Sequence, residues 1–154
     1  MAAAATTLAI LTGCAGEEDV VQMSPLPAVT DQISSLPIWQ AQVGDGVGLY
    51  YSALQPTVAY DKVFAADRQG TVAAFDLESG ERIWQRSVQT DTSALLSGGL
   101  SASYGKVYVG GETGELYALD AETGDRLWQH NVNGEILAKP LVDAGLVIVN
   151  TSRG

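Results

Sequence analysis

The residues best suited to covalent or acid–base chemistry are few and far apart in this sequence. Cys14 is the only cysteine and carries the only thiol, which excludes an intrachain disulfide. His130 is the only histidine, and no cysteine or serine nucleophile stands near it along the chain. Nucleophilic catalysis needs a nucleophile and a base within hydrogen-bond reach, so we expect no catalytic residue and interpret His130 as a surface side chain.

Three other segments look like ligand sites but fail on composition or spacing. Residues 76–80 (Asp-Leu-Glu-Ser-Gly) begin like a calcium loop, but the glycine is fifth instead of sixth and position twelve holds no glutamate. The glycine-rich segment 44–48 precedes no helical pattern that could supply a phosphate-binding N-terminus. Residues 105–107 lack the serine or threonine of a P-loop. The sequence therefore predicts no metal site and no cofactor.

Cys14 stands where a lipid anchor could be attached. Residues 1–13 are apolar, uncharged and rich in small side chains, as in a secretory signal. Residues 11–14 (Leu-Thr-Gly-Cys) then resemble the bacterial lipobox, in which the cysteine thiol receives a diacylglyceryl group and cleavage frees an amine for a further acyl chain. One chain anchors a protein marginally and several anchor it stably. We predict Cys14 as the lipidation site; the alternative is a free thiol at a frayed terminus.

The residues on either side of the lipobox bear on location and domain organisation. No basic residue precedes the apolar stretch, so we expect the natural start to lie upstream, or the chain to be clipped. Residue 15 is alanine and not aspartate, which, by resemblance to lipoprotein sorting signals, favours the outer membrane. Residues 14–37 are acidic at first and contain prolines at 25, 27 and 37, which indicates an extended linker. Residues 38–154 are expected to hold the folded domain.

The charge balance excludes several functions. Eight basic residues face 18 acidic ones, for a net charge of −10, and no basic residue occurs before Lys62. Such a surface repels phosphate backbones, so we expect no nucleic-acid partner. It also gains nothing from anionic lipid headgroups. The alternative is that the charge serves solubility alone.

The second half of the sequence repeats itself. Residues 62–84 and 106–128 align without a gap at an offset of 44, and residues 147–149 align with 107–109 at an offset of 40. A Trp-Gln-x-x-Val pattern occurs three times, beginning at Trp39, Trp84 and Trp128. A fixed period of this length is the signature of a repeat architecture.

Each repeat indicates four short strands. In the second complete unit we expect strands at 100–103, 106–109, 115–119 and 126–132, separated by turns that contain glycine. Glycine supplies the positive φ that tight hairpins require. A unit of about 40–45 residues with four strands is typical of a β-propeller blade. We therefore predict an all-β chain that forms part of a propeller.

A block of fixed positions recurs in the two complete units as A-x-D-x-x-[S/T]-G-x-x-x-W. The positions are Ala74, Asp76, Ser79, Gly80 and Trp84 in the first unit and Ala118, Asp120, Thr123, Gly124 and Trp128 in the second. This block resembles the tryptophan-docking motif of PQQ-type propellers, in which an indole stacks between neighbouring blades. A large flat aromatic suits that role because one blade cannot bury its own faces. The alternative is that both tryptophans are ordinary core residues.

Beyond the tryptophan motif, residues 17–27, 43–52, 65–70 and 94–99 resemble the BamB family of outer-membrane assembly lipoproteins. The likeness covers residues 11–154, with lipobox, linker and repeats in the family's order. It implies an eight-bladed PQQ-like β-propeller, of which residues 38–154 would form about two and a half blades. We expect such a piece to expose blade edges and to be poorly stable alone.

The resemblance also implies a function without catalysis. BamB-like proteins are scaffold lipoproteins of the BAM complex, held on the periplasmic side of the outer membrane, that assist insertion of β-barrel proteins. Implied partners are BamA, the outer membrane through the lipid anchor, and nascent outer-membrane proteins. The BamA-binding loops lie mostly in later blades, so no contact residue transfers to this chain. Two alternatives stay open: another PQQ-repeat lipoprotein acting as a sensor or adhesion module, and a fragment of a PQQ-dependent dehydrogenase. The second demands calcium ligands, a catalytic aspartate and commonly a vicinal disulfide, which one cysteine cannot form.

Overall fold

The computed structural model describes residues 24, 35–89 and 93–154, and the chain divides into Met1–Ser35 and Leu36–Gly154. Everything below concerns the second unit. The expected signal segment 1–13, the predicted lipidation site Cys14 and most of the expected linker 14–37 lie outside the described residues.

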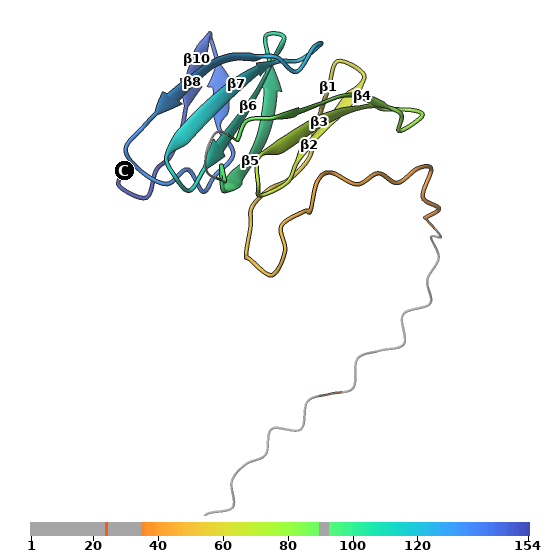
Figure 1. The fold of residues 1–154 in the computed structure, drawn as a ribbon, viewed down its shortest axis with the longest axis horizontal. Coiled ribbons are helices and arrows are strands. Elements are labelled where there is room, and N and C mark those ends of the chain that lie inside the picture. Colours follow the sequence, from red (N-terminus) through yellow and green to blue (C-terminus); the bar gives the residue numbers. More distant parts are fainter. Residues whose placement is uncertain (1–23, 25–34, 90–92) are drawn as a thin grey trace, which may run out of the picture. The chain divides into compact units, whose positions relative to one another are not determined.

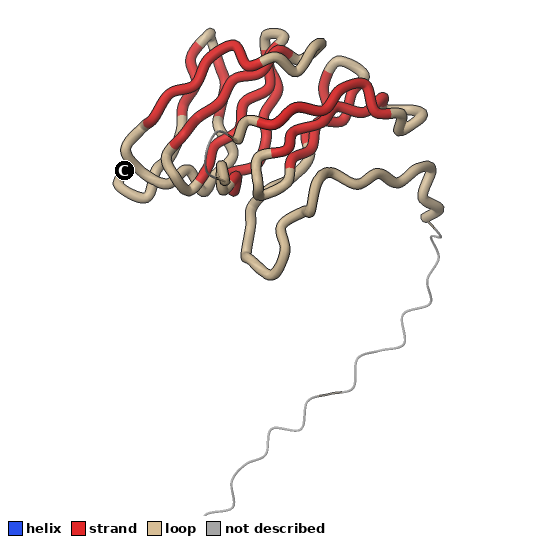
Figure 2. Tube along the Cα trace, in the orientation of Figure 1, coloured by secondary structure: helices blue, strands red, loops and turns tan. Residues whose placement is uncertain are grey.

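Two four-stranded antiparallel sheets and a hairpin make up this unit (Figures 1 and 2). The first sheet contains β1 (Thr57–Ala59), β2 (Lys62–Ala66), β3 (Thr71–Asp76) and β4 (Arg82–Ser87), paired in chain order. The second contains β5 (Leu96–Ser103), β6 (Lys106–Gly111), β7 (Glu115–Asp120) and β8 (Arg126–Asn131), in the same order. The hairpin joins β9 (Leu141–Asp143) to β10 (Leu146–Ile148). The described part of the chain holds no helix, so the predicted all-β fold is confirmed.

The same tight turn opens each repeat. Residues 60–61, 104–105 and 144–145 connect the first two strands of the three units. Both central residues of every turn have positive φ, between 46° and 79°. This is the type I′ geometry, whose twist matches that of the flanking strands. The turns follow one another at 44 and 40 residues, so the hairpin β9–β10 begins a third unit in register with the other two.

Each complete sheet carries an aromatic–alanine–aromatic row across its last three strands. In the first sheet Ala74 pairs with Phe64 on one side and Trp84 on the other, and Ala118 pairs in the same way with Tyr108 and Trp128. The small central residue lets the two rings meet above it: their centroids are 5.9 Å apart in both sheets. Alanine at this motif position is thus explained by the packing of its neighbours.

The first strand of the second unit is longer than the sequence predicts. It spans Leu96–Ser103, where we expected residues 100–103, and an irregularity in pairing falls between Leu96 and Leu100. Gly98 and Gly99 occupy this bulge. A Cβ on Gly98 would lie 2.7 Å from the carbonyl oxygen of Ala138, so another backbone segment approaches the strand here. Two glycines and a bulge break the alternation on which the prediction depended.

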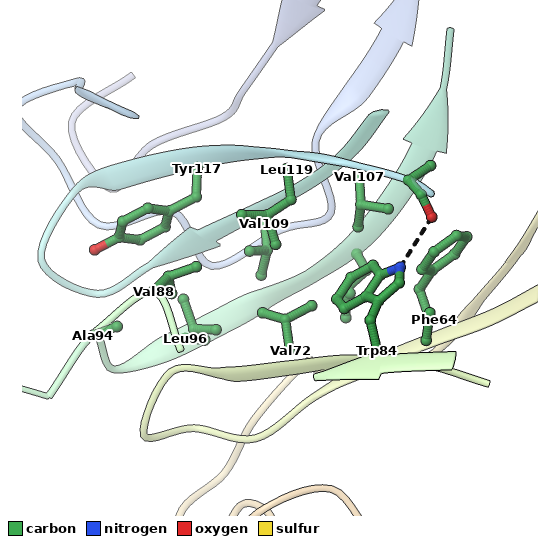
Figure 3. Close-up of a cluster of buried hydrophobic side chains, with 13 residues drawn as sticks. Phe64, Val72, Trp84, Val88, Ala94, Leu96, Val107, Val109, Tyr117 and Leu119 are labelled. Carbon is green, nitrogen blue, oxygen red and sulfur yellow. Dashed lines mark hydrogen bonds between the residues drawn. The ribbon is translucent and has the colours of Figure 1, made fainter. Parts of the chain in front are cut away.

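The hydrophobic core lies between the two complete sheets (Figure 3). Phe64, Val72 and Trp84 of the first sheet face Val107, Val109 and Leu119 of the second. All six side chains are buried. The sheets therefore pack face to face, and both supply apolar side chains to the core between them.

Candidate functional site: the tryptophan-docked boundaries between sheets

The boundary between the two complete sheets, here called the first boundary, is centred on Trp84. Its indole is 6% exposed, and its Nε1 donates a hydrogen bond of 3.1 Å to the backbone oxygen of Ala121 (Figure 3). Ala121 belongs to the turn between β7 and β8 of the neighbouring sheet. The single polar atom of a buried aromatic is thereby satisfied across the boundary.

The indole of Trp84 packs directly against Gly124. Its φ is +75°, and a Cβ at this position would stand 2.5 Å from Cε3 of Trp84. Any side chain would meet two penalties, because left-handed backbone disfavours L residues and the indole fills the space. The glycine of the repeated motif therefore shapes the turn and admits the neighbouring tryptophan.

The aspartates of the motif hold these turns together. Oδ1 of Asp120 accepts hydrogen bonds from the backbone amides of Glu122 and Thr123, at 2.8 and 2.9 Å. Oδ1 of Asp76 accepts from the amide and the hydroxyl of Ser79, both at 2.8 Å. In each turn the backbone amide of the Ser or Thr is the main cause that lowers the aspartate pKa. Oδ1 of each carboxylate is thus used by donors of its own turn.

Trp39 makes the same contacts one repeat earlier. Its Nε1 donates to the backbone oxygen of Leu77 at 3.0 Å, and its ring stacks with Phe75 at 6.2 Å between centroids. A Cβ on Gly80 would lie 2.5 Å from Cδ2 of Trp39. Trp39 stood apart from the motif in the sequence and was visible only through the Trp-Gln-x-x-Val pattern. The structure brings it onto residues 76–80, the turn equivalent to 120–124.

Trp128 faces the second boundary, between the second sheet and the hairpin β9–β10, and is 37% exposed. It lines an open groove of about 490 Å³ together with Leu116, Gln129, His130, Val132, Val147 and Val149. Leu116, Trp128 and Val132 occupy the repeat positions of Val72, Trp84 and Val88, which are buried at the first boundary. The second boundary thus has the equivalent tryptophan, Trp128, but no turn of the described residues docks on it.

Ion pairs across the first boundary were not predicted. Nη2 of Arg68 lies 2.7 Å from Oε2 of Glu112, and Nζ of Lys62 lies 2.9 Å from Oε1 of Glu122. Arg68 and Glu112 are themselves 44 residues apart, so one repeat position carries opposite charges in successive units. That reversal of charge was the signal available in the sequence. The Arg68 guanidinium also stacks over the ring of Tyr50, at 4.2 Å from its centroid.

No arrangement for catalysis or metal binding is found in the described residues. His130 lies exposed on β8, and no group of three or more His, Cys, Asp or Glu side chains is placed to hold a metal ion within these ranges. None of the described segments forms a helix long and apolar enough to span a membrane. Among the repeated residues, Trp84 joins the first sheet to the second through its contacts with Ala121 and Gly124.

Consecutive four-stranded antiparallel sheets, joined by an indole that docks on a turn of the next sheet, define a β-propeller in which each sheet is one blade. The family model described as "Outer membrane protein assembly factor BamB" matches residues 36–104 and 68–154. The chain belongs to the BamB family. The family resemblance predicted from the sequence is therefore confirmed.

Other BamB proteins support the assignment, and a dehydrogenase structure shares the fold. BamB from Vibrio cholerae is 60% identical over 151 residues, a match that covers 98% of this chain and 39% of the relative. The crystal structure of BamB from Moraxella catarrhalis superimposes with a TM-score of 0.58 and 30% identity, over 66% of this chain and 30% of that one. A quinohemoprotein alcohol dehydrogenase from Comamonas testosteroni gives 0.55 and 31%, over 64% and 17%. The chain spans about two fifths of the length of the curated relatives it matches.

Proposed function

We propose that the full-length protein is a non-enzymatic scaffold of the BAM complex that assists assembly and insertion of β-barrel proteins into the outer membrane. One observation carries this proposal: 60% identity, over nearly the whole chain, to a relative named as an outer membrane protein assembly factor. The first boundary supports it, because the polar atom of Trp84 is used to hold two blades together and Asp120 is used to hold the turn on which Trp84 docks. BamA is the proposed direct partner, and nascent outer-membrane proteins are the proposed clients.

The proposal includes a role for the repeated motif. Ala74, Asp76, Ser79, Gly80 and Trp84, with their counterparts Ala118, Asp120, Thr123, Gly124 and Trp128, build docking turns and the tryptophans that dock on them. The glycine and the aspartate shape the turn, the alanine lets the aromatic rings meet, and the tryptophan joins the blades. A stiff curved platform with loops on its rims follows from that construction.

The first experiment asks whether the full-length protein joins the complex. We expect affinity-tagged full-length protein, extracted from outer membranes in detergent, to co-purify with BamA in constant ratio. Recovery of the protein alone would contradict the proposal. Oxidation of alcohols by the full-length protein after loading with PQQ and calcium would replace it with the dehydrogenase interpretation.

The second experiment tests the lipid anchor, for which residues 1–13 are the proposed signal and residues 14–37 the proposed tether to the membrane. Cells are labelled with radioactive palmitate, and the protein is immunoprecipitated. We expect label in the wild type, none in Cys14→Ser, and normal label in the matched control Ala15→Ser. Label that survives in Cys14→Ser would exclude Cys14 as the acylated residue.

A further inference from the structure

The first turn of each complete blade contains a tyrosine in an unfavourable backbone conformation. Tyr60 has φ +56° and Tyr104 has φ +52°, each at the first central position of a type I′ turn. Bulky L side chains are rarely found there, where asparagine, aspartate and glycine are preferred. The equivalent position of the third unit is Ala144, so the fold itself does not require a tyrosine.

Tyr60 has a contact that compensates for this strain. The backbone amide of Gly105 donates a hydrogen bond of 2.9 Å to its hydroxyl oxygen, across the first boundary. Gly105 is the second central residue of the next blade's turn, where a hairpin leaves the amide free. The tyrosine in one turn thus satisfies the open amide of the equivalent turn in the next blade.

Tyr104 stands at the same position 44 residues later, facing the second boundary. Its side chain is 59% exposed, and no hydrogen bond of its hydroxyl is found in the described residues. The amide that corresponds to Gly105 at this boundary is that of Gly145, which also has positive φ, +79°. Every component of the Tyr60 contact is therefore present a second time, and only the contact is missing.

We propose that Tyr60 and Tyr104 form a tyrosine latch, a device in which each turn tyrosine accepts a hydrogen bond from the turn glycine of the next blade. In the full-length protein, where the second boundary is packed like the first, Tyr104 accepts from Gly145. The latch acts on the rim opposite the Arg68–Glu112 pair, so the two contacts fix the angle between blades from both ends. Strain at Tyr104 is retained because the contact it prepares is made when the blades pack.

Amide hydrogen exchange in the full-length protein tests the latch directly. We expect the Gly105 and Gly145 amides to exchange slowly in the wild type. Tyr104→Phe keeps the ring and removes the hydroxyl oxygen, so it should accelerate exchange of Gly145 by about tenfold, for a hydrogen bond of ordinary strength, and leave Gly105 unchanged. Tyr60→Phe is the matched control and should accelerate Gly105 alone. Fast exchange of Gly145 in the wild type, or no change in Tyr104→Phe, would overturn the proposal.

A second measurement separates the latch from simple packing. In the full-length protein Tyr104→Phe should lower the melting temperature about as much as Tyr60→Phe, because each change removes one hydrogen bond across a boundary and keeps the ring. A melting temperature of Tyr104→Phe equal to that of the wild type, beside a lowered one for Tyr60→Phe, would show that the Tyr104 hydroxyl makes no contact with the following blade.

Discussion

The two boundaries of the chain are built from equivalent residues and differ in what covers the tryptophan. At the first boundary Trp84 is 6% exposed, hydrogen-bonded to Ala121 and packed on Gly124. At the second boundary Trp128 is 37% exposed and lines an open groove. The aromatic row behind the two indoles is the same, with centroids 5.9 Å apart in each blade. The contact between the tryptophan and its aromatic neighbour is therefore made within the blade, and the next blade supplies the burial of the indole and its hydrogen bond.

The largest difference should come from removing the indoles. Trp84→Ala opens a cavity between packed sheets, which costs about 3–5 kcal/mol. In the 154-residue chain, which we expect to be poorly stable, this change should therefore leave no cooperative unfolding transition. Trp128→Ala should cost no more than about 2 kcal/mol, because less apolar surface is buried there. Equilibrium urea denaturation measures both.

The same two variants should behave differently in the full-length protein. If the following blade covers Trp128 as the second blade covers Trp84, the two variants should become equally destabilising. Equal losses already in the 154-residue chain would show that docking on the next blade contributes little, and that the tryptophans act within their own blades.

This comparison also shows how far the sequence was informative. The 44-residue offset, the tryptophan motif and the glycine turns identified blades and their strands, because each blade repeats its local chemistry at fixed spacing. Burial could not be predicted in this way: Trp84 and Trp128 have identical motifs, and their environments depend on contacts with residues far along the chain. The Arg68–Glu112 pair and the docking of Trp39 were missed for the same reason. The bulge at Gly98–Gly99 hid half of β5 because it interrupts the two-residue alternation.

The docking glycine gives the next largest effect. We expect Gly124→Ala to destabilise the chain by about 2–4 kcal/mol, since the new methyl group combines a left-handed backbone with an overlap on Trp84. Gly105→Ala is the matched control: its φ is +69°, and nothing lies within 4 Å of the added Cβ. It should cost only about 1 kcal/mol, the backbone penalty alone. Equal losses in thermal or urea unfolding would mean that the indole moves aside freely.

The ion pair at the rim should have a smaller effect. Glu112→Gln leaves the guanidinium of Arg68, whose side chain is 10% exposed, without its charged partner. We expect a loss of about 1–2 kcal/mol, the usual cost of weakening one charged hydrogen bond in a partly buried site. Glu122→Gln is the control: that carboxylate is 70% exposed, so a change within about 0.5 kcal/mol is expected. If the two variants were equally stable in urea, the Arg68–Glu112 pair would be no more than a surface contact.

The smallest effect concerns the pH dependence of the docking turn. The backbone amide of Thr123, followed by that of Glu122, lowers the pKa of Asp120 below its ordinary value of 3.8. A carboxyl group whose pKa is lower in the folded chain stabilises the fold above the unfolded pKa, and this contribution is lost as pH falls through the folded pKa. The wild type should therefore lose stability below about pH 3.8, and Asp120→Asn should show a shallower decline there. Urea unfolding measured from about pH 5 to pH 2.5 gives both slopes, with Asp143→Asn on β9 as the control. Parallel curves for the wild type and Asp120→Asn would show that the negative charge of Asp120 adds nothing to the turn on which Trp84 docks. The amides of Thr123 and Glu122 would then donate as strongly to an amide oxygen as to a carboxylate.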